Sequence, residues 1–154
     1  MLPPLFKKMT FGSSPNLVVL NAPASFESEL EGMMGLTKVY VSIPPTEKIQ
    51  FVLVFVQTLA DIEHAVAALK DGFADDPQFW LAYPKGSSKN YVCEFNRDTG
   101  WEALGAAGYE PVRQVALDED WSALRFRQVS HIKQLTRSHS MALSEEGKVR
   151  TRKS

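Results

Sequence analysis

The chain has 154 residues, 44% of them hydrophobic, which is sufficient for one domain with its own core. Its longest strongly apolar run, residues 51–56, is far too short to span a bilayer, and the N-terminal segment lacks the apolar region of a secretory signal. The only cysteine, Cys93, excludes an intrachain disulfide and suits a reducing compartment. We therefore expect a cytoplasmic protein that does not enter a membrane.

The net charge of −1 is unevenly distributed along the chain. From residue 131 onward six basic residues accompany two acidic ones, a net charge of +4, which leaves −5 for residues 1–130. We expect one α/β domain over residues 1–130 and a basic, disordered tail over residues 131–154, because the tail lacks apolar periodicity. No aromatic residues are interleaved with these few cations, so we do not expect nucleic acid as a partner.

The first predicted strand covers residues 17–20, which are continuously apolar, as in a strand covered on both faces. A helix is predicted next, with Ser25 as its N-cap and Gly35 at its end. Its apolar stripe consists of Phe26, Leu30 and Met33.

Two further strands are predicted over residues 38–43 and 49–58, and the second is the strongest strand signal in the chain. The connection between them, which contains Pro44 and Pro45, is too short for a normal helical crossover. Either the second strand is short and marginal, or it runs antiparallel to its neighbours.

The second half of the chain continues the alternation of helix and strand. Residues 58–72 form a helix that begins with the capping signature of Thr58 and Asp61. A buried strand over residues 78–84 and a helix over residues 98–107 follow.

The last two predicted strands cover residues 111–117 and 122–129. The acidic turn that joins them, residues 118–120, is so short that they can only pair antiparallel. The whole order of elements predicts a mostly parallel α/β sheet covered by helices.

Three segments of the second half carry a family resemblance: "YPKGSSK" at residues 83–89, "NRDTGW" at 96–101 and "GYEPVRQVALDEDWSALRFR" at 108–127. Through them the chain, over residues 17–127, resembles a small bacterial family of Rossmann-like proteins of unknown function, which look like truncated S-adenosylmethionine-dependent methyltransferases. The resemblance implies a three-layer Rossmann-like sheet of about six strands. It also implies the strand order 2-1-3-4-6-5, with the last strand antiparallel.

The chain departs from the cofactor determinants of those methyltransferases in two places. They carry a glycine-rich turn after the first strand, where the backbone approaches the cofactor closely, whereas residues 21–25 contain no glycine. They also carry a carboxylate at the end of the second strand, where this chain has Ser42 and Ile43. We therefore expect the fold without the cofactor, and a non-catalytic role.

The loop that follows the strand at residues 78–84 is the leading candidate for a binding site. Open α/β sheets bind ligands at the carboxyl ends of their strands, where this loop would present backbone N–H groups, hydroxyls and positive charge to an anion. An alternative is a solvated loop in which serine and glycine serve only the geometry of the turn. The candidate residues are Lys85, Gly86, Ser87, Ser88 and Lys89.

Three residues outside the loop, Arg97, Trp121 and Arg125, are further candidates for ligand binding. The guanidinium group of Arg97 would add a pair of N–H donors for a carboxylate or phosphate, although a surface ion pair is the simpler interpretation. For the neighbouring Asp98, helix capping is the simpler interpretation. Trp121 and Arg125 share one face of the last strand. There Arg125 would need an acidic partner, which we expect among residues 118–120.

The sequence contains no recognisable catalytic constellation. His64 stands alone on its helix, and no spacing of residues predicts a metal site. Cys93 has no nominated base and is better explained as a small buried residue of an alternating segment. The leading hypothesis is a non-catalytic module that binds a small anion or a protein partner. The alternatives are a divergent S-adenosylmethionine-dependent methyltransferase and a homo-oligomeric structural protein that uses an exposed edge strand.

Overall fold

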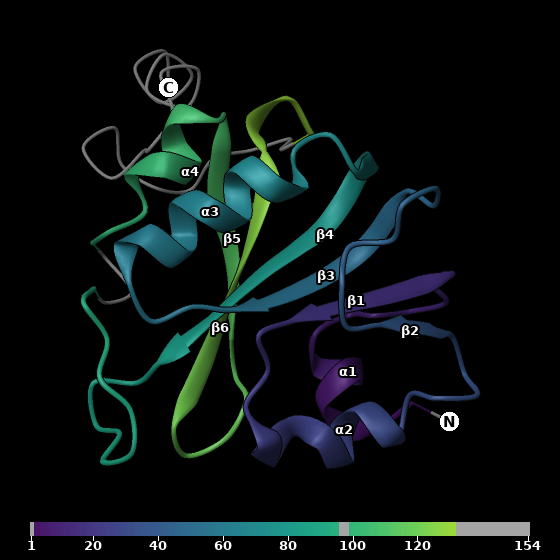
Figure 1. Ribbon diagram of the computed structural model, residues 1–154, viewed down its shortest axis with the longest axis horizontal. Helices are drawn as coiled ribbons and strands as arrows, with labels where there is room; N and C mark the ends of the chain where they lie inside the picture. The colour runs from purple at the N-terminus through teal and green to yellow at the C-terminus, as the bar shows by residue number, and fades with distance from the viewer. Residues whose placement is uncertain (1, 96–98, 132–154) are drawn as a thin grey trace.

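A six-stranded sheet organises the protein, and the computed structural model describes residues 2–95 and 99–131. The strands are β1 (Asn16–Leu20), β2 (Lys38–Tyr40), β3 (Ile49–Phe55), β4 (Phe73–Pro84), β5 (Tyr109–Ala116) and β6 (Trp121–Gln128). Their order in the sheet is β2-β1-β3-β4-β6-β5, which confirms the order that the resemblance implied (Figure 1). Strand β6 runs antiparallel between β4 and β5, and the pairings among β1 to β4 are all parallel.

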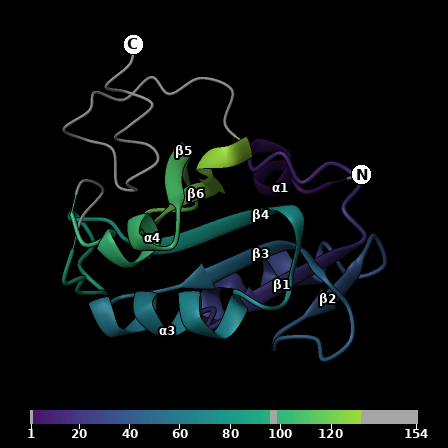
Figure 2. The same cartoon turned by 90° about the horizontal axis from the view of Figure 1, so that it is seen from above.

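Helices cover both faces of the sheet, and Figure 2 shows two of them, α1 and α3, on opposite sides. One face carries α1 (Pro4–Lys8) and α2 (Glu27–Glu31), with the 3₁₀ turn η1 (Ala24–Phe26) before α2. The other face carries α3 (Leu59–Leu69) and α4 (Glu102–Ala106). A second 3₁₀ turn, η2 (Val129–His131), follows β6. No helix in the described part of the chain is long and apolar enough to cross a membrane.

The core is divided into two clusters because neighbouring residues of a strand point to opposite faces. In β1, Leu17 and Val19 pack under α1 and α2, whereas Val18 packs under α3 and α4. Burial on both faces explains the continuously apolar sequence of this strand. The alternation predicted for β6 is confirmed, with Trp121 on the first face and Leu124 on the second.

The N-terminal segment forms part of the core, which the sequence did not predict. In α1, Phe6 is fully buried, and Met9 directly after the helix is fully buried as well. Pro4 occupies the first position of α1, where the proline ring restricts φ to values that suit a helix start. The helix has only five residues, too few for a visible apolar period, so its formation depends on tertiary packing.

The predicted caps had different outcomes. The capping box of Thr58 and Asp61 is confirmed, because each side chain accepts a backbone N–H from the other residue. The prediction of Ser25 as an N-cap is wrong: Ser25 lies inside η1, and neither η1 nor α2 has a side-chain cap. Of the helix predicted over residues 98–107, Glu102–Ala106 forms α4, whereas residues 99–101 are described and not helical, so the helix begins later than predicted.

Strand β2 is short and parallel to β1, which decides between the two alternatives for this strand. It has three residues and lies at the edge of the sheet. The connection to β3, residues 41–48, contains no helix.

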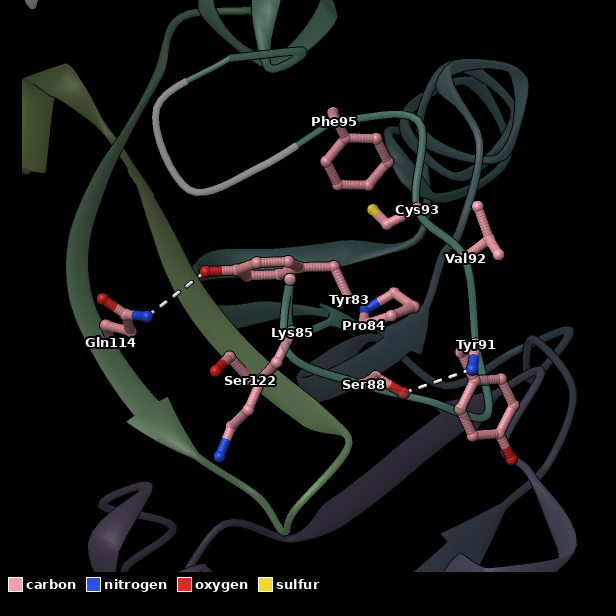
Figure 3. A pocket seen from close by; sticks show the side chains of 11 residues that line it. Tyr83, Pro84, Lys85, Ser88, Tyr91, Val92, Cys93, Phe95, Gln114 and Ser122 are labelled. Atoms are coloured by element: carbon pink, nitrogen blue, oxygen red, sulfur yellow. Dashed lines mark hydrogen bonds between the residues drawn. The ribbon is translucent and has the colours of Figure 1, made fainter.

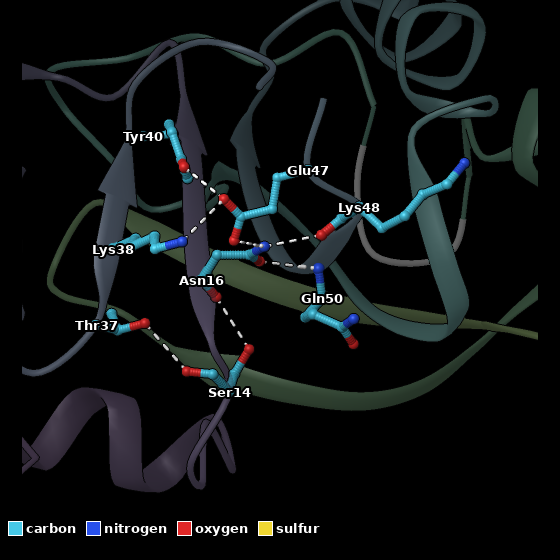
Figure 4. Close-up of polar contacts among 8 residues, drawn as sticks. All are labelled: Ser14, Asn16, Thr37, Lys38, Tyr40, Glu47, Lys48 and Gln50. Carbon is cyan, nitrogen blue, oxygen red and sulfur yellow. Dashed lines mark hydrogen bonds and ion pairs between the residues drawn. The ribbon is translucent and has the colours of Figure 1, made fainter. Parts of the chain in front are cut away.

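This connection is held by a network of polar side chains and contains no packed helix (Figure 4). The Tyr40 hydroxyl donates to Glu47 Oε2 at 2.6 Å, and Asn16 Nδ2 donates to Glu47 Oε1 at 3.0 Å. The fully buried Asn16 also donates to the Lys48 carbonyl at 2.8 Å and accepts the Gln50 N–H at 3.0 Å. These hydrogen bonds, first that from Tyr40 and then that from Asn16, lower the pKa of Glu47.

Candidate functional site

A cavity of about 480 Å³ opens at the carboxyl end of β4 (Figure 3). It lies on the face that carries α3 and α4, because Tyr83 and Phe95 in its wall belong to that core cluster. The cavity contains three residues of the predicted loop: Lys85, Gly86 and Ser88. The sequence therefore predicted that this loop lies at the carboxyl edge of the sheet, and ligand binding by the loop stays a prediction.

The walls of the cavity differ in polarity. In Figure 3 the side chains of Val92, Cys93 and Phe95 lie on one side, and those of Lys85 and Ser122 on the other. At the polar side Gln114 Nε2 donates to the Tyr83 hydroxyl at 3.2 Å. The β5–β6 hairpin thus supplies Gln114 and Ser122, two polar groups that sequence reasoning missed because they lie far along the chain from the loop.

Lys85 supplies positive charge to the polar side of the cavity. Its side chain is partly buried and makes no hydrogen bond or ion pair within residues 2–95 and 99–131. Its backbone is fixed, because the Lys85 N–H donates to the Asp120 carbonyl at 2.7 Å. An ammonium group that has no partner among the described residues and is carried by a fixed backbone can pair with an anion.

Ser88 has a structural role in the same loop. Its hydroxyl donates to Asp120 Oδ1 at 2.9 Å and accepts the N–H groups of Tyr91 at 3.2 Å and Asn90 at 3.3 Å. Asn90 Nδ2 donates to the second carboxylate oxygen of Asp120 at 3.1 Å. The Ser88 hydroxyl proton is therefore committed to Asp120, and for this residue the turn-geometry alternative describes the structure.

The other loop candidates contribute less to the cavity. Ser87 and Lys89 are exposed and do not line it. The backbone of Gly86 does not adopt a left-handed conformation, and a Cβ atom there would meet nothing within 4 Å. Arg97 and Asp98 lie outside the described residues.

The structure separates Trp121 and Arg125 from Lys85. Trp121 is buried on the opposite face of the sheet, between Phe55 at 5.0 Å and Tyr91 at 4.8 Å between ring centroids. Arg125 alternates with Ala123 and so lies on that opposite face as well. Neither residue lines the cavity.

The predicted acidic partner of Arg125 among residues 118–120 is wrong. Asp118 Oδ1 accepts the N–H groups of Asp120 and Trp121 within the turn, at 2.8 and 2.9 Å. Asp120 is bound to Ser88 and Asn90, and Glu119 makes no ion pair with a described residue. Carboxylates in a tight hairpin turn bind the backbone of the turn itself, because the nearest donors are there.

The turn after β1 has a conformation that its composition does not reveal. Asn21 has a φ angle of 61°, in the left-handed region that favours glycine and that asparagine tolerates best among other residues. A cavity of about 440 Å³ adjoins it on one side, lined by Glu27 and Glu31. A cavity of about 340 Å³ adjoins it on the other side, lined by Asp61 and His64.

Cys93 and the potential metal ligands are the remaining candidates. Cys93 is half-buried in a segment whose burial alternates as predicted, although the segment is an irregular loop and not a strand. Burial, and then the charge of Glu94, raise the pKa of the Cys93 thiol, which keeps it protonated. Among the described residues no group of three potential ligands could hold a metal ion.

Comparison with known proteins places the fold. No protein-family model matches the chain, and no match was found among curated proteins. The glycopeptide N-methyltransferase MtfA aligns with a TM-score of 0.53 over 80% of this chain and 92% of its own, with 9% identity. N-methyltransferase NodS from Bradyrhizobium japonicum WM9 aligns with a TM-score of 0.50 over 78% and 89%, with 11% identity.

A third solved structure gives the same result. The S-adenosylmethionine-dependent methyltransferase from Aquifex aeolicus has a TM-score of 0.50 over 83% of this chain and 91% of its own, with 14% identity. At such low identity the likeness concerns the fold alone. The chain therefore has a Rossmann-like fold that resembles methyltransferases, as the sequence resemblance implied.

Proposed function

We propose that the protein is a binding module for a small organic anion, held in the cavity at the end of β4. The observation that carries this proposal is Lys85, a partly buried residue that lines the cavity and whose ammonium group has no partner among the described residues. The volume of about 480 Å³ lies in the range of small-molecule sites.

The walls suggest an anion with an apolar body. The side formed by Val92, Cys93 and Phe95 would contact carbon atoms, and Lys85 with Ser122 would contact the charged group. The carboxylate of Asp120 anchors the loop nearby and offsets part of its positive charge. A monocarboxylate therefore fits this cavity better than a diphosphate, which requires several cations.

Isothermal titration calorimetry with a panel of anions tests the proposal. The panel contains short-chain and aromatic carboxylates, inorganic phosphate and a nucleoside monophosphate. We expect a carboxylate to bind, and Lys85→Ala to weaken it about 10- to 100-fold through loss of a charge-assisted hydrogen bond. Lys89→Ala is the matched control, because Lys89 is exposed and outside the cavity, and it should leave the affinity unchanged. Silence across the panel, or equal losses in both variants, would refute the proposal.

A second candidate function is that of a divergent S-adenosylmethionine-dependent methyltransferase. The left-handed Asn21 between two cavities favours it, together with the fold. The residues do not fit the cofactor in the manner of the related enzymes, because the position after β2 offers Ser42 where a carboxylate is needed. We therefore derive no transfer step.

Differential scanning fluorimetry with S-adenosylmethionine separates the two candidates. A ligand that binds only the native state at 100 times its Kd stabilises it by about 2.7 kcal/mol. No shift of Tm at millimolar cofactor would rule the methyltransferase out. Self-association through the edge strand β2 stays a prediction, which light scattering on the full chain would test.

A further inference from the structure

Arg125 has a buried donor that no described residue satisfies. Its side chain is partly buried on the face with α1 and α2, and its Nε atom is buried without an acceptor. No hydrogen bond or ion pair to Arg125 is formed within residues 2–95 and 99–131. A guanidinium group cannot lose its proton in a protein, so a buried N–H of this group without an acceptor is costly. The described residues therefore leave the buried Nε–H of Arg125 without an acceptor.

Two further arginines flank this position. Arg127 is already paired, because its Nε and Nη2 donate to the carboxylate of Asp76 at 2.8 and 2.5 Å. Arg113 is the cross-strand neighbour of Arg125 in β5. One Nη of Arg113 donates to the Lys8 carbonyl at the end of α1 at 3.1 Å, which orients its guanidinium and leaves its other N–H groups available.

The pairing of Arg113 with Arg125 is unfavourable without an anion. Residues directly opposite on neighbouring strands have their Cβ atoms about 5 Å apart, and like charges there destabilise the sheet. Burial, and then the charge of Arg127, lower the pKa of Arg125; the charge of Asp76 acts in the opposite direction, and that of Arg113 lowers the pKa further. The carboxylate of Glu110 lies opposite Arg127 in the register and not opposite Arg125.

We propose that Arg125 and Arg113 bind a compact oxoanion on this face of the sheet: inorganic phosphate or the phosphate group of a larger ligand. Guanidinium groups present planar pairs of N–H donors that match the oxygen atoms of such anions. A dianion balances the two positive charges, which one carboxylate does not. The two arginines come from paired strands of one hairpin, so they are held in position before the anion arrives.

Calorimetric titration of the full chain with phosphate tests the site. All titrations use Lys85→Ala as the background, which removes the cation of the cavity on the other face, and constant ionic strength. We expect phosphate or glycerol 3-phosphate to bind, acetate to bind less, and Arg125→Gln to weaken phosphate binding about 10- to 100-fold. Binding of both phosphates indicates a site for free oxoanion, and binding of glycerol 3-phosphate alone indicates a larger phosphorylated ligand.

The matched control is Lys70→Gln, which removes one exposed positive charge at the end of α3, on the opposite face. It should leave the affinity unchanged, because a screened surface charge at that distance contributes little. If Arg125→Gln does not fold, as judged by circular dichroism, Arg113→Gln at its exposed position carries the test with the same expected loss. The proposal is overturned if neither phosphate binds, or if the arginine variants bind as tightly as the background.

Discussion

The two adjacent serines of the β4 loop offer a direct test of what the loop is for. Ser88 makes three hydrogen bonds, to Asp120 and from the N–H groups of Asn90 and Tyr91, whereas Ser87 is exposed. If the serines served only to hold an anion, replacing either of them by alanine would leave the stability of the free protein unchanged. If Ser88 is an anchor of the turn, only Ser88→Ala should destabilise it.

The magnitude follows from the geometry of these bonds. The bond to the Asp120 carboxylate is short, at 2.9 Å, and charge-assisted, but it is partly exposed. The two bonds from backbone N–H groups are longer, at 3.2 and 3.3 Å, and water can replace part of each. We expect Ser88→Ala to cost about 1–2 kcal/mol of unfolding free energy, which lowers Tm by about 3–6 °C for a domain of this size.

Urea denaturation followed by circular dichroism measures this difference, with Ser87→Ala as the matched control. The control should change the unfolding free energy by less than about 0.5 kcal/mol, as is usual for an exposed position. Equal effects of the two substitutions would refute the assignment of Ser88 as the anchor. A stable Ser88→Ala variant that loses only anion affinity would indicate instead that the Ser88 hydroxyl binds the anion.

Three further predictions concern the residues that hold the fold. Asn16→Ala should cost about 2–4 kcal/mol in urea denaturation, because it removes three hydrogen bonds of a fully buried side chain. The pKa of Glu47 is lowered in the folded state, so its carboxylate stabilises the fold at pH values above its ordinary pKa of 4.5. This contribution is lost as the pH falls through the lower pKa of the folded state. Glu47→Gln should therefore show a smaller loss of Tm between about pH 6 and about pH 3 than the wild type, and parallel curves would contradict the network. Gly100→Ala should lower the free energy of unfolding by about 2–4 kcal/mol, because the φ angle of Gly100 is 94° and a Cβ atom would overlap Phe95. Gly86→Ala, with open space around Gly86, should lower it by less than about 0.5 kcal/mol. Similar losses in both variants would contradict this account.

The sequence was most informative for strands whose pattern of apolar residues reflects burial on both faces of the sheet. The continuously apolar β1 and the alternating β6 were both predicted, and the resemblance supplied the strand order that periodicity cannot give. Helix α1 could not be predicted, because a five-residue segment with Pro4 at its start has no period to detect. The left-handed turn at Asn21 had a weak signal, since asparagine is the side chain that best tolerates this conformation.

The candidate site was predicted in part, and the reason lies in the geometry of strands and loops. Strand alternation correctly placed Trp121 and Arg125 on one face of β6. It could not show on which face of the sheet the cavity beside Lys85 would lie. Lys85 follows the end of β4, and the alternation of side chains between the two faces applies only within a strand. Sequence reasoning therefore grouped residues that the sheet separates, and the separated Arg125 became evidence for a site of its own.

The cavities at the carboxyl edge of the sheet differ in the charge of the residues that line them. The two cavities that adjoin Asn21 are lined by carboxylates, Glu27 and Glu31 in one and Asp61 in the other, whereas the cavity at the end of β4 is lined by Lys85. A cationic sulfonium cofactor would therefore be attracted to the β1 turn, and an organic anion to the β4 loop. Because screening weakens both attractions, salt alone does not separate the two functions. The Lys85→Ala variant does: it removes a charge that attracts an anion and would repel a cation, so it should weaken anion binding and leave cofactor binding unchanged or stronger.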